Sequence, residues 1–262
     1  MNKKAVFFDI DGTLWRRGLP VPDSAVSAIR KLREEGHFVF LNSGRSKAHI
    51  YNKRLLEIGW DGIISGLGTH VMYGDKVLYS ILLSQTEWNR IIDLSADCGV
   101  RMIIEGENNL YFDDEDYQDD PYGQKLMREL GSIRKHIKGQ NEDFIAGKFS
   151  VDIDEDADRE RWFDGLKERY RFIRHSDNIF EVVPLGHDKA TGMAMAADYL
   201  GIDRSDTIAF GDSINDKDML QNAGVGIALG NSIEKIKEIA DLVTDNVEDD
   251  GVRNALLKLG LI

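Results

Sequence analysis

The sequence has almost no cysteine and no long apolar run, and each shortage excludes a class of protein. Its single cysteine, Cys98, cannot form a disulfide within the chain, which fits a reducing compartment or a fold indifferent to redox state. No stretch approaches the roughly 20 apolar residues of a membrane span. The apolar segment behind the basic start, Met1–Lys4, is cut short by Asp9 and is too short for a signal peptide. We therefore expect a cytoplasmic protein without a membrane partner.

Positive charge is also scarce. The 262 residues include 33 lysines and arginines against 46 aspartates and glutamates, a formal net charge of -13. No basic stripe interleaved with aromatic residues offsets this balance, which argues against a nucleic-acid partner. Such a protein can still bind phosphate esters if a metal ion or a lysine lies at the site. The 42% hydrophobic content is ample for one large domain or two modest ones, and no feature predicts an oligomeric state.

The chain is organised around the stretch from Ala5 to Thr13, a short apolar run that stops at two carboxylates, Asp9 and Asp11. The run predicts a buried strand, and the Asp-Gly pair that follows predicts a sharp turn. Both carboxylates would leave the carboxyl end of a central strand, where open α/β sheets bind ligands. Fixed side by side, they favour a divalent cation or a shared proton. Taken alone, the motif fits equally well a solvated turn in which Asp11 caps the next segment.

Strand-like and helix-like patterns alternate at both ends of the chain, which predicts a doubly wound, Rossmann-like parallel α/β sheet. In the first part they are a helix over 21–36, a strand over 38–41, a helix through Ile50, Leu55 and Ile58, a strand over 62–66 and a hairpin over 70–79. In the last part they are a helix from Lys189 to Gly201 and strands over 207–210, 225–228 and 242–243.

Between these parts the order of the patterns changes and predicts a separate α+β domain, an antiparallel sheet with helices on one face. Its expected elements are helices over 86–98 and 156–170 and strands over 101–105, 109–112, 145–153, 172–174 and 179–183. The acidic run 113–116 favours a solvated loop over a metal site, because four adjacent acids cannot all face one ion. We therefore predict a core of residues 1–79 and 187–262 and an insert of residues 80–186.

Polar groups stand at four corresponding places of the predicted core. They are Asp9 with Asp11, Ser43, Lys189, and Asp212 with Asp216. Ser43 or Ser46 could be an ordinary N-cap, and an isolated helix lysine or turn aspartate is common. However, the carboxyl ends of parallel strands share one edge, so all four places should meet there. Asp212 would supply a third carboxylate for a hard cation, Lys189 a positive charge and Ser43 a neutral donor.

The strings at these places resemble the four motifs of the haloacid dehalogenase (HAD) superfamily. They are Asp9-Ile10-Asp11-Gly12-Thr13, Ser43-Gly44-Arg45, Lys189 and Gly211-Asp212-Ser213-Ile214-Asn215-Asp216. The position and length of the insert resemble the subclass IIB cap of the Cof-type phosphatases, so the resemblance spans the whole chain. Ser43 stands where threonine is more usual, which preserves the hydroxyl. The resemblance implies a Rossmann-like core, an inserted cap that sets substrate specificity, and a magnesium-dependent phosphatase.

The resemblance also implies the catalytic roles. Asp9 would attack phosphorus and form an aspartyl-phosphate intermediate, while Lys189 screens the repulsion between the two anions. Asp11 would protonate the leaving alkoxide and then activate the water that hydrolyses the intermediate. Magnesium would be held by the side chains of Asp9 and Asp212 and the main-chain carbonyl of Asp11. Asp216 would steady Lys189 or a water on the metal.

Phosphate or substrate binding is implied for a second set of residues, namely Ser43, Gly44, Asn215 and Arg45. Arg45 fits an ordinary exposed arginine on a helix equally well. The expected substrates are small-molecule phosphate esters such as sugar phosphates, nucleotides or cofactor phosphates. Two alternatives remain open. A phosphomutase would return the phosphoryl group to a sugar. A non-enzymatic, phosphate-responsive binding or signalling protein would have no need of the acid/base Asp11.

Overall fold

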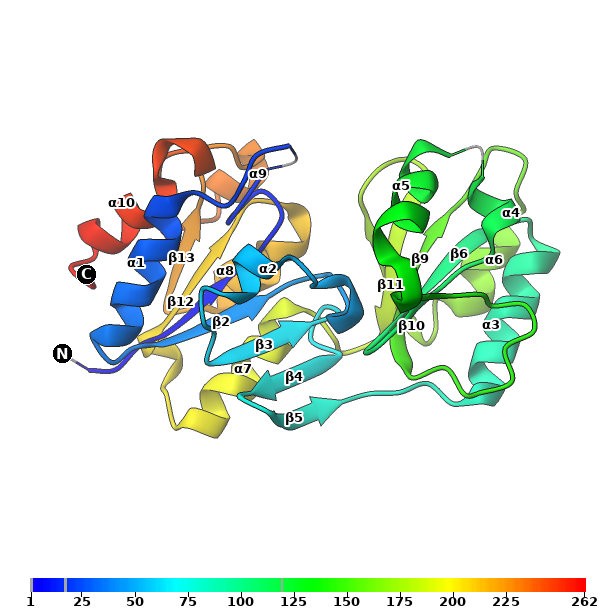
Figure 1. Cartoon of the computed structure of the whole chain (residues 1–262), viewed down its shortest axis with the longest axis horizontal. Helices are drawn as coiled ribbons and strands as arrows, with labels where there is room; N and C mark the ends of the chain where they lie inside the picture. Colours follow the sequence, from blue (N-terminus) through cyan, green and yellow to red (C-terminus); the bar gives the residue numbers. More distant parts are fainter. Residues whose placement is uncertain (1, 17, 119) are drawn as a thin grey trace. The chain divides into compact units, whose positions relative to one another are not determined.

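The structure, a computed structural model, describes residues 2–16, 18–118 and 120–262, and it divides into two compact units (Figure 1). The first unit contains the chain up to Gly44, then Tyr51–Tyr79 and Asp188–Ile262. The second unit contains Arg45–Ile50 and Ser80–His187. A short segment directly after Gly44 is therefore grouped with the second unit.

A mixed, mainly parallel sheet forms the first unit. Within the described chain its strands follow the order β14, β13, β12, β1, β2, β3, β4 and β5. Pairing is parallel from β14 through β3, and β4 adds to β3 antiparallel. The order runs outward from β1 in both directions, which confirms the doubly wound α/β prediction. The strands are β1 Ala5–Phe8, β2 Phe38–Asn42, β3 Gly62–Ser65, β4 His70–Tyr73, β5 Lys76–Ser80, β12 Thr207–Gly211, β13 Val225–Ala228 and β14 Leu242–Val243.

Strand β1 lies at the centre of this sheet and is apolar on both faces. All four of its side chains are fully buried. The Phe7 ring stacks on Phe40 at 5.1 Å, and the Phe8 ring stacks on Phe210 at 4.8 Å. A strand covered on both faces reads as a continuous apolar run, as the sequence does here. Asp9 therefore emerges from the middle of the sheet.

Helices cover this sheet on both faces. Ala5 and Phe7 share a core cluster with Met193 of α7 and Met219 of α8. The helices α7 and α8 contact each other. Since alternate residues of a strand face opposite sides, Val6 and Phe8 point to the other face. The helices of this unit are α1 Asp23–Glu34, α2 Lys53–Leu56, α7 Lys189–Leu200, α8 Lys217–Asn222, α9 Glu234–Lys237 and α10 Gly251–Lys258.

The second unit is a sheet with helices. Its strands are β6 Arg101–Gly106, β7 Leu110–Tyr111, β8 Arg134–Lys135, β9 Ala146–Asp152, β10 Tyr170–Arg174 and β11 Ile179–Pro184, in the spatial order β10, β11, β9, β6, β7, β8. Its helices are α3 Gln85–Asp97, α4 Asp114–Tyr117, α5 Pro121–Leu130 and α6 Arg159–Leu166. Trp88 and Trp162 pack edge-on against Phe149, at 5.7 and 6.5 Å. Pairing is antiparallel except between β7 and β8.

The helix predicted through Ile50, Leu55 and Ile58 is wrong as one continuous element. A 3₁₀ turn at Lys47–His49 ends before Ile50, and the separate four-residue α2 follows. Asn52 causes the break, because its side chain caps α2 by accepting the N–H of Leu55 at 3.0 Å.

The acidic run was also misread as a solvated loop. Asp113 is buried, and its Oδ1 accepts the N–H groups of Ile137 and Lys138, each at 3.1 Å. Residues 114–117 form α4. Helix α5 was not predicted, and the helix expected over 156–170 is confined to α6. Among the described residues, the helices are too short or too polar to cross a membrane.

Candidate active site

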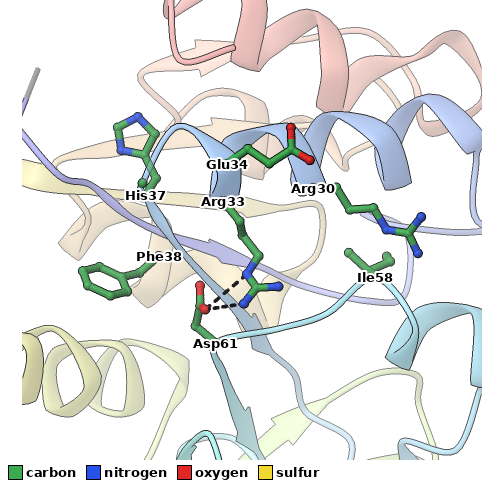
Figure 2. Close-up of a pocket in the computed structure, with 8 residues that line it drawn as sticks. Arg30, Arg33, Glu34, His37, Phe38, Ile58 and Asp61 are labelled. Atoms are coloured by element: carbon green, nitrogen blue, oxygen red, sulfur yellow. Dashed lines mark hydrogen bonds and ion pairs between the residues drawn. The ribbon is translucent and has the colours of Figure 1, made fainter.

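An open pocket of about 510 Å³ lies beside the start of β2, as Figure 2 shows. Both arginines that line it already donate hydrogen bonds within the protein. Arg33 donates to Asp61 at 2.8 Å, and Arg30 donates to the carbonyl of Glu57 at 2.7 Å. Phe38 lines this pocket and begins its strand, whereas Asp9 follows the carboxyl end of the parallel neighbour β1. The site residues predicted from the sequence therefore lie at the opposite ends of these strands from this pocket.

Asp9 continues the central strand by one residue. Its backbone N–H donates to the carbonyl of Phe210 at 3.1 Å, so the ladder between β1 and β12 extends to this residue. The Asp9 residue is only 3% exposed. The sheet thus fixes the backbone that carries this carboxylate.

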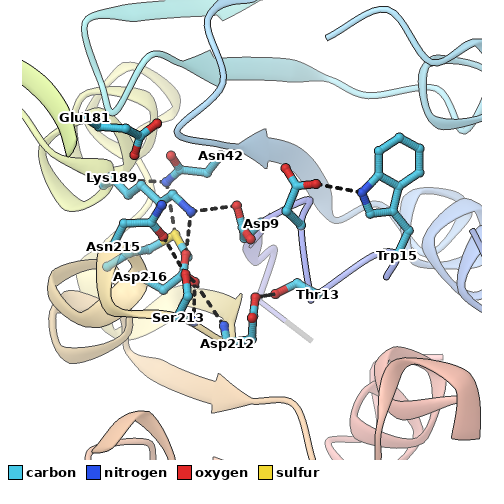
Figure 3. Close-up of polar contacts among 12 residues, drawn as sticks. Asp9, Thr13, Trp15, Asn42, Glu181, Lys189, Asp212, Ser213, Asn215 and Asp216 are labelled. Carbon is cyan, nitrogen blue, oxygen red and sulfur yellow. Dashed lines mark hydrogen bonds and ion pairs between the residues drawn. The ribbon is translucent and has the colours of Figure 1, made fainter. Parts of the chain in front are cut away.

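Lys189 is the first residue of α7, and its ammonium lies between two carboxylates (Figure 3). Its Nζ donates to Asp9 Oδ1 and to Asp216 Oδ1, both at 2.6 Å. The side chain is fully buried. A capping box fixes where the helix begins, because Asp188 accepts the N–H of Thr191 at 2.7 Å and Thr191 Oγ1 accepts the N–H of Asp188 at 3.0 Å. The cap therefore determines where this lysine enters the site.

Asp216 supports both the lysine and its own loop. While Oδ1 accepts from Lys189, Oδ2 accepts the N–H groups of Asp212 and Ser213, each at 3.0 Å. The side chain is fully buried. Both oxygens are thus occupied within the protein, which leaves this carboxylate poorly suited to bind a ligand.

Asp212 is held against the turn that follows β1. Thr13 Oγ1 donates to Asp212 Oδ1 at 3.0 Å. A Cβ atom on Gly12 would lie 2.1 Å from Asp212 Oδ2, and Gly12 also has a φ of +93°. Only glycine satisfies both conditions without strain. Asn231 also secures the turn by donating to the Gly12 carbonyl at 2.8 Å.

Three carboxylates converge here against one ammonium. Oxygens of Asp9, Asp212 and Asp216 all lie within 4.8 Å of one another. Burial, followed by the charge of Asp216, raises the pKa of Asp9 well above its ordinary value and that of Asp212 to about 7. Burial alone would lower the pKa of Lys189, but the charges of Asp216 and Asp9 raise it above its ordinary value. The site therefore carries an excess of negative charge.

This set of donors fits a hard divalent cation such as magnesium. All the candidate ligands are oxygens, which such ions prefer, and a cation would relieve the repulsion between them. Since Asp216 is engaged with Lys189 and the loop, the side chains left to hold an ion are those of Asp9 and Asp212.

The remaining predicted residues have different surroundings. Ser43 directly follows β2, is buried, and donates its N–H to the Ile64 carbonyl at 2.9 Å. Gly44 ends the first segment of the same unit. Asn215 accepts from Ser213 Oγ at 2.9 Å beside Asp216.

Arg45 belongs to the second unit, where it donates to the His49 carbonyl at 3.3 Å. Asp11 is exposed, and its Oδ1 accepts the indole N–H of Trp15 at 2.9 Å.

Two supporting residues of this site were not singled out from the sequence. Asn42 is fully buried, and its Nδ2 donates to the Lys189 carbonyl at 2.8 Å, which links the end of β2 to the start of α7. Thr13 holds Asp212. Asn42 offered one signal, a polar residue at the end of an apolar strand. Thr13 is the last residue of the motif Asp9–Thr13, but the sequence alone did not indicate that it binds Asp212.

The chain is similar to a family model and to proteins of known name over nearly its whole length. The family model described as haloacid dehalogenase-like hydrolase matches residues 6–256. The Bacillus subtilis (strain 168) protein named "Putative phosphatase YkrA" is 32% identical, with all of both chains covered. The 5-amino-6-(5-phospho-D-ribitylamino)uracil phosphatase YitU of the same organism is 26% identical, over 96% of this chain and 95% of that protein. The solved structure of BT4131, described as a HAD subclass IIB sugar phosphatase, has a TM-score of 0.82 at 27% identity, over 99% of this chain and 100% of that one.

Proposed function

Because the chain belongs to the haloacid dehalogenase-like hydrolases and is a phosphatase of that family, we propose that it hydrolyses small-molecule phosphate monoesters, with magnesium, through a phosphorylated Asp9. The observation that carries this proposal is the contact of Lys189 with Asp9, in a cluster that also includes Asp212. A carboxylate can attack an anionic ester only if positive charge lies beside it. Lys189 supplies one such charge, and a cation held by Asp9 and Asp212 would supply the rest.

The first half of the reaction transfers the phosphoryl group to the protein. A carboxylate oxygen of Asp9 forms a bond to phosphorus while the bond from phosphorus to the ester oxygen breaks. The electron pair of that bond goes to the leaving oxygen, which takes a proton from Asp11. Lys189 keeps its positive charge beside Asp9 and screens the approach of the two anions.

The second half restores the carboxylate. Asp11, now ionised, takes a proton from water, and the water oxygen attacks phosphorus and releases inorganic phosphate from Asp9. In this proposal Ser43, Gly44 and Asn215 donate hydrogen bonds to the phosphoryl oxygens, and Arg45 contributes to substrate binding.

Magnesium fits the donor set described above. The side chains of Asp9 and Asp212 and the main-chain carbonyl of Asp11 would hold it. When bound, the ion supplies positive charge that polarises the phosphoryl group. Asp216 would act indirectly, by holding Lys189 and the loop of Asp212.

We assign the choice of substrate to the second unit, which in this proposal acts as the cap. Two relatives support a phosphorylated polyol or sugar as the substrate. YitU is named for an ester with a phosphoribityl group, and BT4131 is described as a sugar phosphatase. The cytoplasmic location expected from the sequence stays a prediction.

The proposal is tested by incubating the purified chain with magnesium and a panel of sugar, polyol and nucleotide phosphates together with p-nitrophenyl phosphate. We expect release of inorganic phosphate, and a phosphoryl group on Asp9 that mass spectrometry detects after acid quenching. Asp9→Asn, which keeps the volume of the side chain, should abolish both. Transfer of the phosphoryl group to a sugar without phosphate release would indicate the phosphomutase instead. Absence of turnover for every ester would favour the binding-protein alternative.

A further inference from the structure

Trp15 contacts the carboxylate to which the proposed mechanism assigns the proton transfers. Its indole Nε1 donates to Asp11 Oδ1 at 2.9 Å, a bond that Figure 3 marks with a dashed line from the labelled Trp15. Asp11 is exposed, whereas Trp15 is partly buried. An exposed carboxylate with nothing to orient it samples several rotamers, so this contact restricts its direction.

The backbone of the turn places Trp15 opposite Asp11. The carbonyl of Ile10 accepts the N–H of Leu14 at 3.0 Å and that of Trp15 at 3.2 Å. The N–H of Gly12 donates to the Trp15 carbonyl at 2.7 Å, which closes the turn from the other direction. Asp11 and Trp15 form an isolated β-bridge across it. The indole therefore reaches Asp11 from a position that the main chain fixes.

The chemistry of the indole makes this contact directional. An indole N–H only donates and carries no charge, so it holds a carboxyl oxygen without competing for the proton. The indole N–H therefore restrains the direction of the Asp11 carboxyl group without adding a charge beside it.

We propose that Trp15 is a positioning residue, whose bond to Oδ1 holds the Asp11 carboxyl group in the orientation from which it delivers the proton to the leaving oxygen. This inference rests on the proposed function. As the bond between phosphorus and the ester oxygen breaks and that between phosphorus and Asp9 forms, the leaving oxygen takes the proton of Asp11, and Asp11 becomes a carboxylate. Loss of the indole N–H leaves every reacting group present but removes one hydrogen bond that orients the acid.

The test compares two esters that differ in their need for an acid. An alkyl phosphate, such as a sugar phosphate, expels an alkoxide and needs the proton, whereas p-nitrophenyl phosphate expels a stable phenolate. The quantity to measure is kcat/KM, because it reports the steps up to departure of the leaving group and excludes hydrolysis of the intermediate. Trp15→Phe removes the N–H and keeps an aromatic ring.

We expect Trp15→Phe to lower kcat/KM for the alkyl ester by about 10- to 100-fold and to leave that for p-nitrophenyl phosphate within about threefold of wild type. Retained turnover of the second ester also shows that the variant is folded. The matched control is Trp60→Phe, since the Trp60 indole makes the same type of bond, to the Leu55 carbonyl at 2.8 Å, away from Asp11. Trp60→Phe should leave kcat/KM unchanged for both esters.

Three results would overturn the inference. An equal loss on both esters would give Trp15 a structural role only, and no loss on either would remove it from the reaction. If the wild-type chain hydrolyses neither ester, the proposed function fails and this inference fails with it, an outcome that the wild-type measurement alone identifies.

Discussion

The ammonium of Lys189 lies 2.6 Å from Asp9 Oδ1, although 180 positions separate the two residues in the sequence. The contact joins the first strand of the chain to a helix that begins after the second unit has been completed. This pair therefore exists only once both segments of the first unit have come together.

Removal of the lysine charge should harm both stability and turnover. Lys189→Met leaves Asp9 and Asp216 as buried carboxylates without their cation, so we expect a loss of about 3–5 kcal/mol in the free energy of unfolding. Phosphate release should fall below detection. Urea unfolding and a phosphate assay measure the two effects. Lys53→Met, at the exposed start of α2, is the control and should change stability by less than about 0.5 kcal/mol. Wild-type stability in Lys189→Met would contradict the ion pair.

Asp212→Asn should weaken the response to magnesium more than it weakens the fold. The amide has no charge to offer a cation, so the magnesium concentration for half-maximal activity should rise by about 10-fold or more. A chelator should abolish wild-type turnover, and added magnesium should restore it. Asp203→Asn, an exposed aspartate of the same unit, is the control. An unchanged magnesium requirement in Asp212→Asn would remove this carboxylate from the metal site.

Alanine variants of two nearby glycines distinguish the effect of backbone strain from the effect of a steric clash with Asp212. Gly12 and Gly18 both have positive φ, +93° and +86°, but only Gly12 would direct a Cβ atom into Asp212. Gly18→Ala should cost about 1 kcal/mol of stability and retain activity. Gly12→Ala should cost more and lower activity by about 100-fold, because Asp212 has to move. Similar activities in the two variants would show that the approach of Gly12 to Asp212 has no catalytic consequence.

Glu87 should make the stability of the second unit sensitive to acid. Hydrogen bonds from Arg90 and Tyr170 lower the pKa of Glu87 to about 2, against about 4.3 for an unfolded chain. Because the folded pKa is depressed, the stabilisation is fully present above pH about 4.3 and is lost as the pH falls towards 2. Urea unfolding at several pH values should show that the difference between wild type and Glu87→Gln shrinks over this window.

The size of that difference at pH 7 should be about 1 kcal/mol, since the network is partly exposed to solvent. The exposed carboxylate of Glu168 provides the control variant, Glu168→Gln. A difference between wild type and Glu87→Gln that is the same at pH 3 and pH 7 would show that the network does not contribute through the charge of Glu87.

Local patterns were enough to predict the doubly wound sheet, for a physical reason. Strand β1 is buried on both faces, so its sequence is an uninterrupted apolar run, and the carboxylates that end it stand out. The limits of α7 were equally readable, because its capping residues lie only three positions apart in the sequence and a glycine, Gly201, ends the helix with a φ of 65°. Such signals are local and do not depend on distant partners.

What the patterns missed depends on partners far along the chain. Charge alone cannot reveal that Asp113 is buried, because its hydrogen-bond donors are 24 and 25 positions away. Asn42 holds the start of α7 from 147 positions away. Helix α5 begins at a proline in a polar stretch, and among its residues whose burial is described the buried ones are Gly123, Leu126 and Leu130. These features follow from tertiary contacts, which override local preference.

The grouping of Arg45–Ile50 with the second unit has a consequence for anyone who wishes to produce either unit separately. An excision that joins residue 79 to residue 188 would remove β6, against which the 3₁₀ turn at Lys47–His49 lies. The shortened protein would keep that turn without the strand it packs against, so Ala48 and Ile50, which are buried in the whole chain, would become exposed to solvent. A soluble minimal core would therefore need a second deletion or polar replacements at these two positions.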